Sequence, residues 1–435
     1  MITKKKNLLM LLGVGLTVGT LLTGCGNNSN GNSSGDDQEN VTIRFSWWGN
    51  DDRHQATLEM IEKFEELHPN ISVKAEYSGW EGNEEKMAIQ LAGGTEPDLM
   101  QMNFDWFMVY SPDGDGFYNL EDLSDHLDLS GYSEDSLEPG MINGKLNSVT
   151  FGENIGGVVY NKTTFDKFDV PIPETWDDLV EAAKKFPDGY YPLAGLGFHQ
   201  IAQYLAQKYE KPIFDEEGNL NMSVEQIQEG LEWKQSMVDA GVIPTQREVI
   251  ENIGSNSVAT VKQFIEGQYA GQTEWIQGSY SFKQVLDEND QELVLAKYPK
   301  IDGAQIEGVI TQPNMAFSIS KNSRHPEETA KLLNFMLNEK EGVLAMGTAR
   351  GIPGNQKAID ILTEANMISD FEQSILDIMA DTKGIYQGPY FTQSTLTAIY
   401  TDVLERYGLE TISSEEAAES LVRQVETAIE AMKRE

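Results

Sequence analysis

Cysteine is nearly absent from this sequence, and basic residues are few. The only cysteine, Cys25, excludes an intrachain disulfide. The chain has 32 Lys and Arg against 70 Asp and Glu, a formal net charge of −38 at pH 7. Nucleic acids and anionic membranes require a cationic surface, so the composition argues against both as partners. We interpret the negative charge as a solvated surface that keeps the protein soluble.

Local motifs of catalytic or metal sites are also scarce. There is no His-Glu-x-x-His motif and no phosphate-binding loop, and the histidines at 54, 68, 126, 199 and 325 lack the spacing of metal ligands. Asp113-Gly114-Asp115-Gly116 matches the start of a calcium loop, but the later ligands do not follow. We expect no cofactor and no enzymatic activity. A glycosidase with two unmarked carboxylates, a metal receptor, a structural calcium and a peptide receptor stay open as alternatives.

The first residues predict export. Lys4, Lys5 and Lys6 precede an apolar run over residues 8–22, which is shorter than the ~20 residues of a spanning helix. We predict a signal peptide over residues 1–24. Leu22-Thr23-Gly24-Cys25 resembles the bacterial lipobox, in which the cysteine is acylated and becomes the new N-terminus. By that resemblance Cys25 is a lipid anchor; the alternative is a plain signal peptide.

A polar segment follows the cysteine. Residues 26–40 contain only Gly, Asn, Ser, Asp, Gln and Glu, which cannot bury enough surface to fold. With Cys25 this makes residues 25–40 a lipidated cysteine and flexible tether. We expect a protein held by acyl chains at the outer face of the cytoplasmic membrane, in a Gram-positive bacterium.

From Val41 the hydrophobic pattern alternates between strand and helix. Strand patterns over 41–48, 71–77 and 98–102 enclose a helical pattern ended by Pro69-Asn70 and another ended by Gly93-Gly94. This β-α-β-α-β order predicts a largely parallel sheet covered by helices on both faces. Farther along, capping boxes predict helices that begin at Thr175, Ser223 and Ser413, and residues 355–435 read as consecutive helices.

Short motifs in a fixed order resemble the family 1 extracellular solute-binding proteins, the carbohydrate-binding subunits of ATP-driven importers related to maltose-binding protein. They run along the chain as Ile43-Arg44-Phe45-Ser46-Trp47-Trp48-Gly49, Gly93-Gly94-Thr95-Glu96-Pro97-Asp98, Tyr160-Asn161-Lys162, Pro173-Glu174-Thr175-Trp176-Asp177-Asp178-Leu179, Phe264-Ile265-Glu266-Gly267, Ser318-Ile319-Ser320-Lys321 and Gly351-Ile352-Pro353-Gly354.

The resemblance implies an α/β, two-lobe periplasmic-binding-protein-like fold of type II, with a hinge of crossing strands. Mapped by motif, the N-terminal lobe comprises 41–150 plus 310–352, and the C-terminal lobe 151–309 plus 353–435. A monomer would bind an oligosaccharide between the lobes and deliver it to the membrane permease of an ABC importer. The motif that opens with Ser46-Trp47-Trp48-Gly49 and runs to His54 is similar to that of a subgroup that handles uronate-rich plant oligosaccharides such as rhamnogalacturonan fragments.

A sugar site needs flat aromatic platforms and planar hydrogen-bonding groups, and in such sheets it lies beyond the carboxyl ends of the strands. Candidates that follow predicted strands, lie near the expected crossing or match family positions are Trp47, Trp48, Asn50, Asp51, Arg53, His54, Trp80, Asp105, Trp106, Asn154, Trp275, Asn314, Arg350, Tyr386 and Tyr390. One of Trp47 and Trp48 should face the core, because consecutive strand residues point to opposite faces. Asn50 or Asp51 is alternatively a helix cap, and Arg53 either pairs with a substrate carboxylate or is solvated. Trp176 and Trp233 are expected to be packing residues.

Overall fold

The computed structural model describes residues 40–103, 106–215, 218–385, 387 and 390–433. The predicted signal, Cys25, Asp105 and Tyr386 lie outside the described residues, as does the tether except Asn40. Within the described part of the chain, no helix combines the length and apolar character needed to cross a membrane.

The first elements confirm the predicted strand and helix order. They are β1 (Val41–Trp48), α1 (Asp51–Leu67), β2 (Ile71–Ser78), α2 (Asn83–Ala92) and β3 (Leu99–Met102). The stripe of α1 formed by Thr57, Met60, Ile61 and Phe64 is buried, as its helical spacing requires.

The middle of the chain contains a few short elements, the long strand β6 and the helices and strands that follow it. They are α3 (Phe107–Tyr110), α4 (Glu134–Leu137), β4 (Met141–Ile142), β5 (Lys145–Leu146), β6 (Val149–Asn161), α5 (Lys162–Lys167), α6 (Trp176–Lys185), α7 (Phe198–Tyr209), α8 (Val224–Asp239), α9 (Gln246–Asn252), α10 (Lys262–Ile265), β7 (Gly271–Trp275), α11 (Ser279–Glu288), β8 (Leu293–Ala296) and β9 (Thr311–Ile319).

The chain ends in helices α12 (Pro326–Asn338), α13 (Lys340–Met346), α14 (Gln356–Glu364), α15 (Asp370–Asp381), α16 (Ser394–Gly408) and α17 (Ser414–Met432). The predicted capping boxes at Thr175, Ser223 and Ser413 are present at the starts of α6, α8 and α17. The helical reading of the C-terminal stretch is therefore confirmed.

The expectation of a largely parallel sheet was wrong. The strand order is β2-β1-β3-β9-β6-β7, with β8 also paired to β6. Only the pairs β1–β2 and β1–β3 are parallel, whereas β9 and β6–β8 pair in antiparallel fashion. The local β-α-β pattern predicted the parallel strands correctly. The antiparallel partners come from far along the chain, where no local pattern sets direction.

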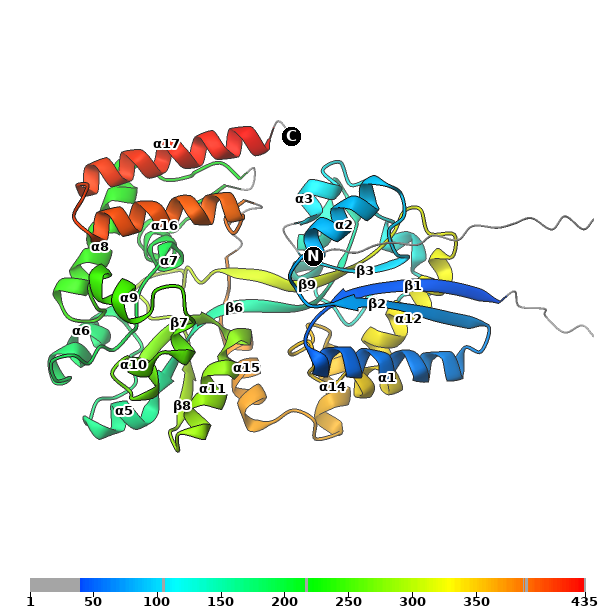
Figure 1. The fold of residues 1–435 in the computed structure, drawn as a ribbon, viewed down its shortest axis with the longest axis horizontal. Coiled ribbons are helices and arrows are strands. Elements are labelled where there is room, and N and C mark those ends of the chain that lie inside the picture. Colours follow the sequence, from blue (N-terminus) through cyan, green and yellow to red (C-terminus); the bar gives the residue numbers. More distant parts are fainter. Residues whose placement is uncertain (1–39, 104–105, 216–217, 386, 388–389, 434–435) are drawn as a thin grey trace, which may run out of the picture. The chain divides into compact units, whose positions relative to one another are not determined.

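Strand β6 belongs to two sets of strands (Figure 1). Its residues 149–155 pair with β9, and its residues 156–161 pair with β7 and β8. The register shifts on either side of Gly152. A β-carbon at Gly152 would lie 2.4 Å from the carbonyl oxygen of Ile352, so this backbone approach requires glycine.

The buried apolar side chains form two large clusters. The first core takes its residues from 41–151 and 315–346, and the second from 158–310 and 391–429. Trp176 and Trp233 lie edge to face in the second core, with ring centroids 4.8 Å apart. Their assignment as packing residues is confirmed.

Candidate functional site

Three of the predicted tryptophans meet at the carboxyl ends of β1–β3. Trp48 ends β1, Trp80 follows β2 and Trp106 follows β3. The rings of Trp80 and Trp106 are stacked, with centroids 5.9 Å apart and 17° between planes, and Trp48 lies edge-on to Trp80 at 5.2 Å. Trp106 is buried and Trp48 nearly so, whereas Trp80 remains 51% exposed. We call these three residues the tryptophan cluster; it offers an indole face on a rigid base.

Trp47, the neighbour on β1, faces the other side of the strand. It is 2% exposed and stacks on Tyr77, with ring centroids 4.9 Å apart. Its Nε1–H donates to Nδ1 of His54 at 3.1 Å. Burial lowers the pKa of His54 below its usual value. The indole N–H of Trp47 and Nδ1 of His54 are therefore hydrogen-bonded to each other.

The polar residues at the start of α1 cap the helix and form hydrogen bonds to the backbone of neighbouring segments. The side chain of Asn50 accepts from the backbone N–H of Arg53 at 3.0 Å, so Asn50 is the helix cap that the sequence allowed. Asp51 is exposed in the first turn. The Arg53 guanidinium donates to the carbonyl oxygens of Trp48 and Ala349, each at 3.3 Å.

Arg350 lies beside Arg53 and is 2% exposed. Its Nε donates to Gln101 and its Nη1 to Thr57, at 3.1 and 2.8 Å, and Nη2 has no partner among the described residues. Burial, and secondly the charge of Arg53, lower the pKa of Arg350. Neither guanidinium forms an ion pair with a carboxylate in the part of the chain that is described. Two adjacent cations without a counter-ion produce a positive local field in an acidic protein.

Two predicted residues connect the crossing strands. Asn154 on β6 accepts from the backbone N–H of Gln277, and Asn314 on β9 accepts from that of Gly152. Asn314 also donates to the carbonyl oxygen of Arg350 at 3.4 Å. Tyr390 packs half-buried against the second core, and burial raises its pKa.

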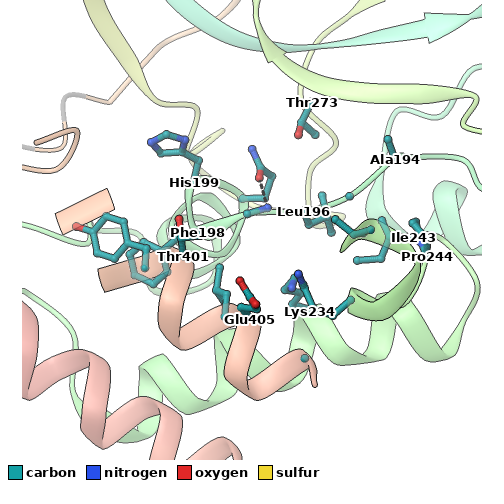
Figure 2. A pocket seen from close by; sticks show the side chains of 18 of the residues that line it. Ala194, Leu196, Phe198, His199, Lys234, Ile243, Pro244, Thr273, Thr401 and Glu405 are labelled. Carbon is teal, nitrogen blue, oxygen red and sulfur yellow. Dashed lines mark hydrogen bonds between the residues drawn. The ribbon is translucent and has the colours of Figure 1, made fainter. Parts of the chain in front are cut away.

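The second core contains a cavity of about 740 Å³ that Trp275 lines. Trp275 ends β7, and its ring lies 5.9 Å from that of His199 on α7 in an edge arrangement. Figure 2 shows His199, Lys234 from α8 and Glu405 from α16 around this space. Leu196, Ile243 and Pro244 add apolar wall. The volume lies in the range of about 300–1,000 Å³ that is typical of small-ligand sites.

Burial controls the charges around this cavity. It lowers the pKa of His199 to about 4 and that of Lys234 to about 8, and it raises the pKa of Glu274. His199 is therefore neutral at pH 7, while Lys234 is mostly a cation. One Glu274 oxygen accepts from the backbone N–H of Trp275 at 2.9 Å.

Of the cavity residues, sequence reasoning predicted only Trp275. Lys234 carried a readable signal, because it occupies an inward position of α8 with Ile227, Leu231 and Met237. A lysine at such a position is unusual. No sequence pattern singled out His199 or Glu274, because a single polar residue near the end of a strand or helix is common.

Metal-binding geometry is not visible in the part of the chain that the structure describes. No group of three or more His, Cys, Asp or Glu residues there could hold an ion. In the Asp-Gly-Asp-Gly turn, Asp115 forms an ion pair with Lys145, and this pairing lowers the pKa of Asp115.

The fold, a half-exposed indole and a cavity of small-ligand size lined by both apolar and charged side chains are typical of a small-molecule-binding protein. The chain belongs to the bacterial extracellular solute-binding protein family, whose model matches residues 59–363. It has the two-lobe α/β fold of type II that this family shares, and it is an extracellular solute-binding protein of the ABC transporter class.

Similar proteins of known structure include a periplasmic oligogalacturonide-binding protein from Yersinia enterocolitica in complex with saturated digalacturonic acid. It is 34% identical, with a TM-score of 0.78, over 90% of this chain and 99% of that one. A de novo designed cysteine esterase is also 34% identical, with a TM-score of 0.85, over 91% and 100% of the two chains. The esterase is a design, whereas the family whose model matches this chain is one of solute-binding proteins.

Among curated proteins, the multiple sugar-binding protein of Streptococcus mutans is 32% identical over 206 residues. This match covers 44% of the present chain and 46% of the relative. The chain thus spans about half the length of that relative.

Proposed function

We propose that this protein captures an acidic oligosaccharide outside the cell and delivers it to the permease of an ABC importer. The observation that carries the proposal is the half-exposed Trp80 indole, supported by Trp106 beneath it. An indole held in this way matches the C–H face of a pyranose ring. An extended peptide has no comparable flat C–H face to stack on the indole, so the arrangement favours a sugar over a peptide.

An acidic sugar is favoured by the cations near the tryptophan cluster. Arg53 donates to the carbonyl oxygen of Trp48, so its guanidinium lies at the same strand end as the cluster. A guanidinium without a counter-ion is suited to a carboxylate. The similarity to a protein described as binding digalacturonic acid points in the same direction.

We further propose that sugar binding closes two lobes about β6 and β9, and that acyl chains on Cys25 hold the protein at the membrane. Ligand contacts must differ between open and closed states for closure to follow. The proposed lobes comprise residues 41–150 plus 310–352 and residues 151–309 plus 353–435. The protein would act as a monomer, and the permease would recognise its closed form.

Calorimetry with saturated digalacturonate, a neutral galacto-disaccharide and a tripeptide tests the ligand class. We expect micromolar or tighter binding of the acidic sugar, and tripeptide binding without sugar binding would contradict the proposal.

Small-angle scattering tests the closure of the lobes, and the radius of gyration should be smaller with bound sugar. Labelling with palmitate tests the lipid anchor: Cys25→Ala should abolish the labelling and release the protein from membranes.

A further inference from the structure

Lys234 is buried in the cavity wall without a partner. It is 8% exposed and lies on α8, and Figure 2 shows its side chain directed into the cavity. In the described part of the chain it makes no hydrogen bond and no ion pair. Burying an unpaired ammonium group is costly unless something else at the site compensates the charge.

The groups around Lys234 do not neutralise it. Glu405 points into the same space from α16 but is not in ion-pair contact with Lys234. The Glu274 carboxylate already accepts from the Trp275 backbone, and its raised pKa shows that burial disfavours its charge. His199 is neutral at pH 7, because burial lowers its pKa. The cavity therefore holds, beside Glu405 and Glu274, an ammonium group without an ion-pair partner and an indole, and it has room for a ligand.

We infer that this cavity binds an acidic sugar residue, with its ring face toward Trp275 and its carboxylate paired with Nζ of Lys234. The inference deepens the proposed function and rests on it, since it assigns the substrate class to a site in the second core. It is separate from Arg53, which lies against the first core. A charge-assisted hydrogen bond to a buried ammonium group discriminates between a carboxylate and its neutral ester.

The test compares saturated digalacturonate with its methyl diester, which has nearly the same shape without the charge. Lys234→Met keeps most of the length of the unbranched side chain and removes the ammonium. We expect this variant to lose about 10- to 100-fold in affinity for digalacturonate and to bind the diester as wild type does. Lys185→Met, on the exposed end of α6, is the matched control and should leave both affinities unchanged.

The outcomes separate the two proposals. If wild type binds digalacturonate and Lys234→Met binds it equally well, the inference about Lys234 is overturned and the proposed function stands. If wild type binds only neutral sugars, the inference fails while sugar capture survives. If wild type binds no saccharide, both fail.

The pH dependence of wild-type binding provides a test that needs no variant. Because the pKa of Lys234 is about 8, digalacturonate affinity should be nearly constant from pH 6 to 7 and should fall as the pH rises through 8, whereas diester affinity stays constant. The other charged or titratable groups lining the cavity are His199, Arg247, Glu274, Glu405, Glu410 and the tyrosines 298, 400 and 407. Burial raises the pKa of the three tyrosines, and His199 is already neutral at pH 6. Equal pH profiles for acid and ester would overturn the inference.

Discussion

The indole of Trp80 lies parallel to that of Trp106, with ring centroids 5.9 Å apart and 17° between their planes. One face of Trp80 is thereby fixed against the protein, and half of the side chain remains accessible. An aromatic surface that is already immobile loses little conformational entropy when a sugar stacks on it.

Trp80→Ala should therefore weaken saccharide binding by about 1–3 kcal/mol, which is roughly 5- to 150-fold in affinity. The free energy of unfolding should change little, because the side chain is half exposed. Calorimetry and denaturant unfolding measure the two effects. Ile89→Ala, which removes a 73% exposed side chain from α2, is the control and should alter neither. Unchanged affinity in Trp80→Ala would remove the tryptophan cluster from the binding site.

Trp275→Ala should weaken sugar binding by a similar ~1–3 kcal/mol, because it deletes the aromatic wall of the cavity. It also opens the cavity next to His199, whose ring lies 5.9 Å away. The pKa of His199 should rise toward its usual value as water enters. NMR titration of the imidazole checks this shift, and an unchanged pKa would show that Trp275 does not shield His199.

Arg53→Gln should reduce affinity for digalacturonate by about tenfold and leave its methyl diester unaffected. The glutamine amide can still donate a hydrogen bond at the start of α1, but it carries no charge. Calorimetry at low and at 0.5 M salt measures the effect, which should shrink as salt screens the charge. Equal losses for acid and ester would assign Arg53 a structural role through Trp48 and Ala349.

His199 makes stability depend on pH in the acidic range. Its folded-state pKa of about 4 lies below the ordinary 6.5, so the unfolded chain binds more protons between these values. Stability is therefore fully present above pH 6.5 and falls as the pH drops toward 4, by up to about 3 kcal/mol. Denaturant unfolding at pH 7 and 4.5 measures the loss. His199→Phe keeps an aromatic ring and should lose less over the same interval; equal losses would contradict the assignment.

Gly152→Ala should destabilise the protein by more than about 2 kcal/mol, because the new methyl group would overlap the Ile352 carbonyl oxygen. Thermal unfolding measures the loss. Gly79→Ala is a suitable control, since a β-carbon there has no atom within 4 Å. A stable Gly152→Ala protein would show that β6 can shift away from the residue 352 loop at little cost.

The local elements could be predicted because short-range chemistry sets them. Period-two alternation identified β2, and paired Thr175 and Asp178 identified the start of α6. Placing tryptophans after strands was enough to nominate Trp48, Trp80 and Trp106, because strand ends converge at one edge of a sheet. Contact between their rings depends on loop conformations that no spacing in the sequence specifies.

The rest depends on contacts between distant segments. The antiparallel insertion of β9 between β3 and β6 joins residues more than 150 positions apart, and no pattern near Thr311 sets its direction. The burial of Arg350 against Thr57 and Gln101 is equally non-local. Lys234 differs, because its inward position on α8 was visible in the sequence.

The first core combines early and late parts of the chain, so it cannot be completed until most of the chain has been synthesised. The first core needs residues 315–346 in addition to 41–151, and β9 lies between β3 and β6 in the strand order. While the ribosome translates the intervening segment, the early strands have no partner on one side. We infer that such a chain stays unfolded for most of its translation, which suits a polypeptide that must be threaded through a secretion channel before it folds. A nascent chain stopped at residue 300 should therefore be protease-sensitive in the first core; resistance would contradict this view.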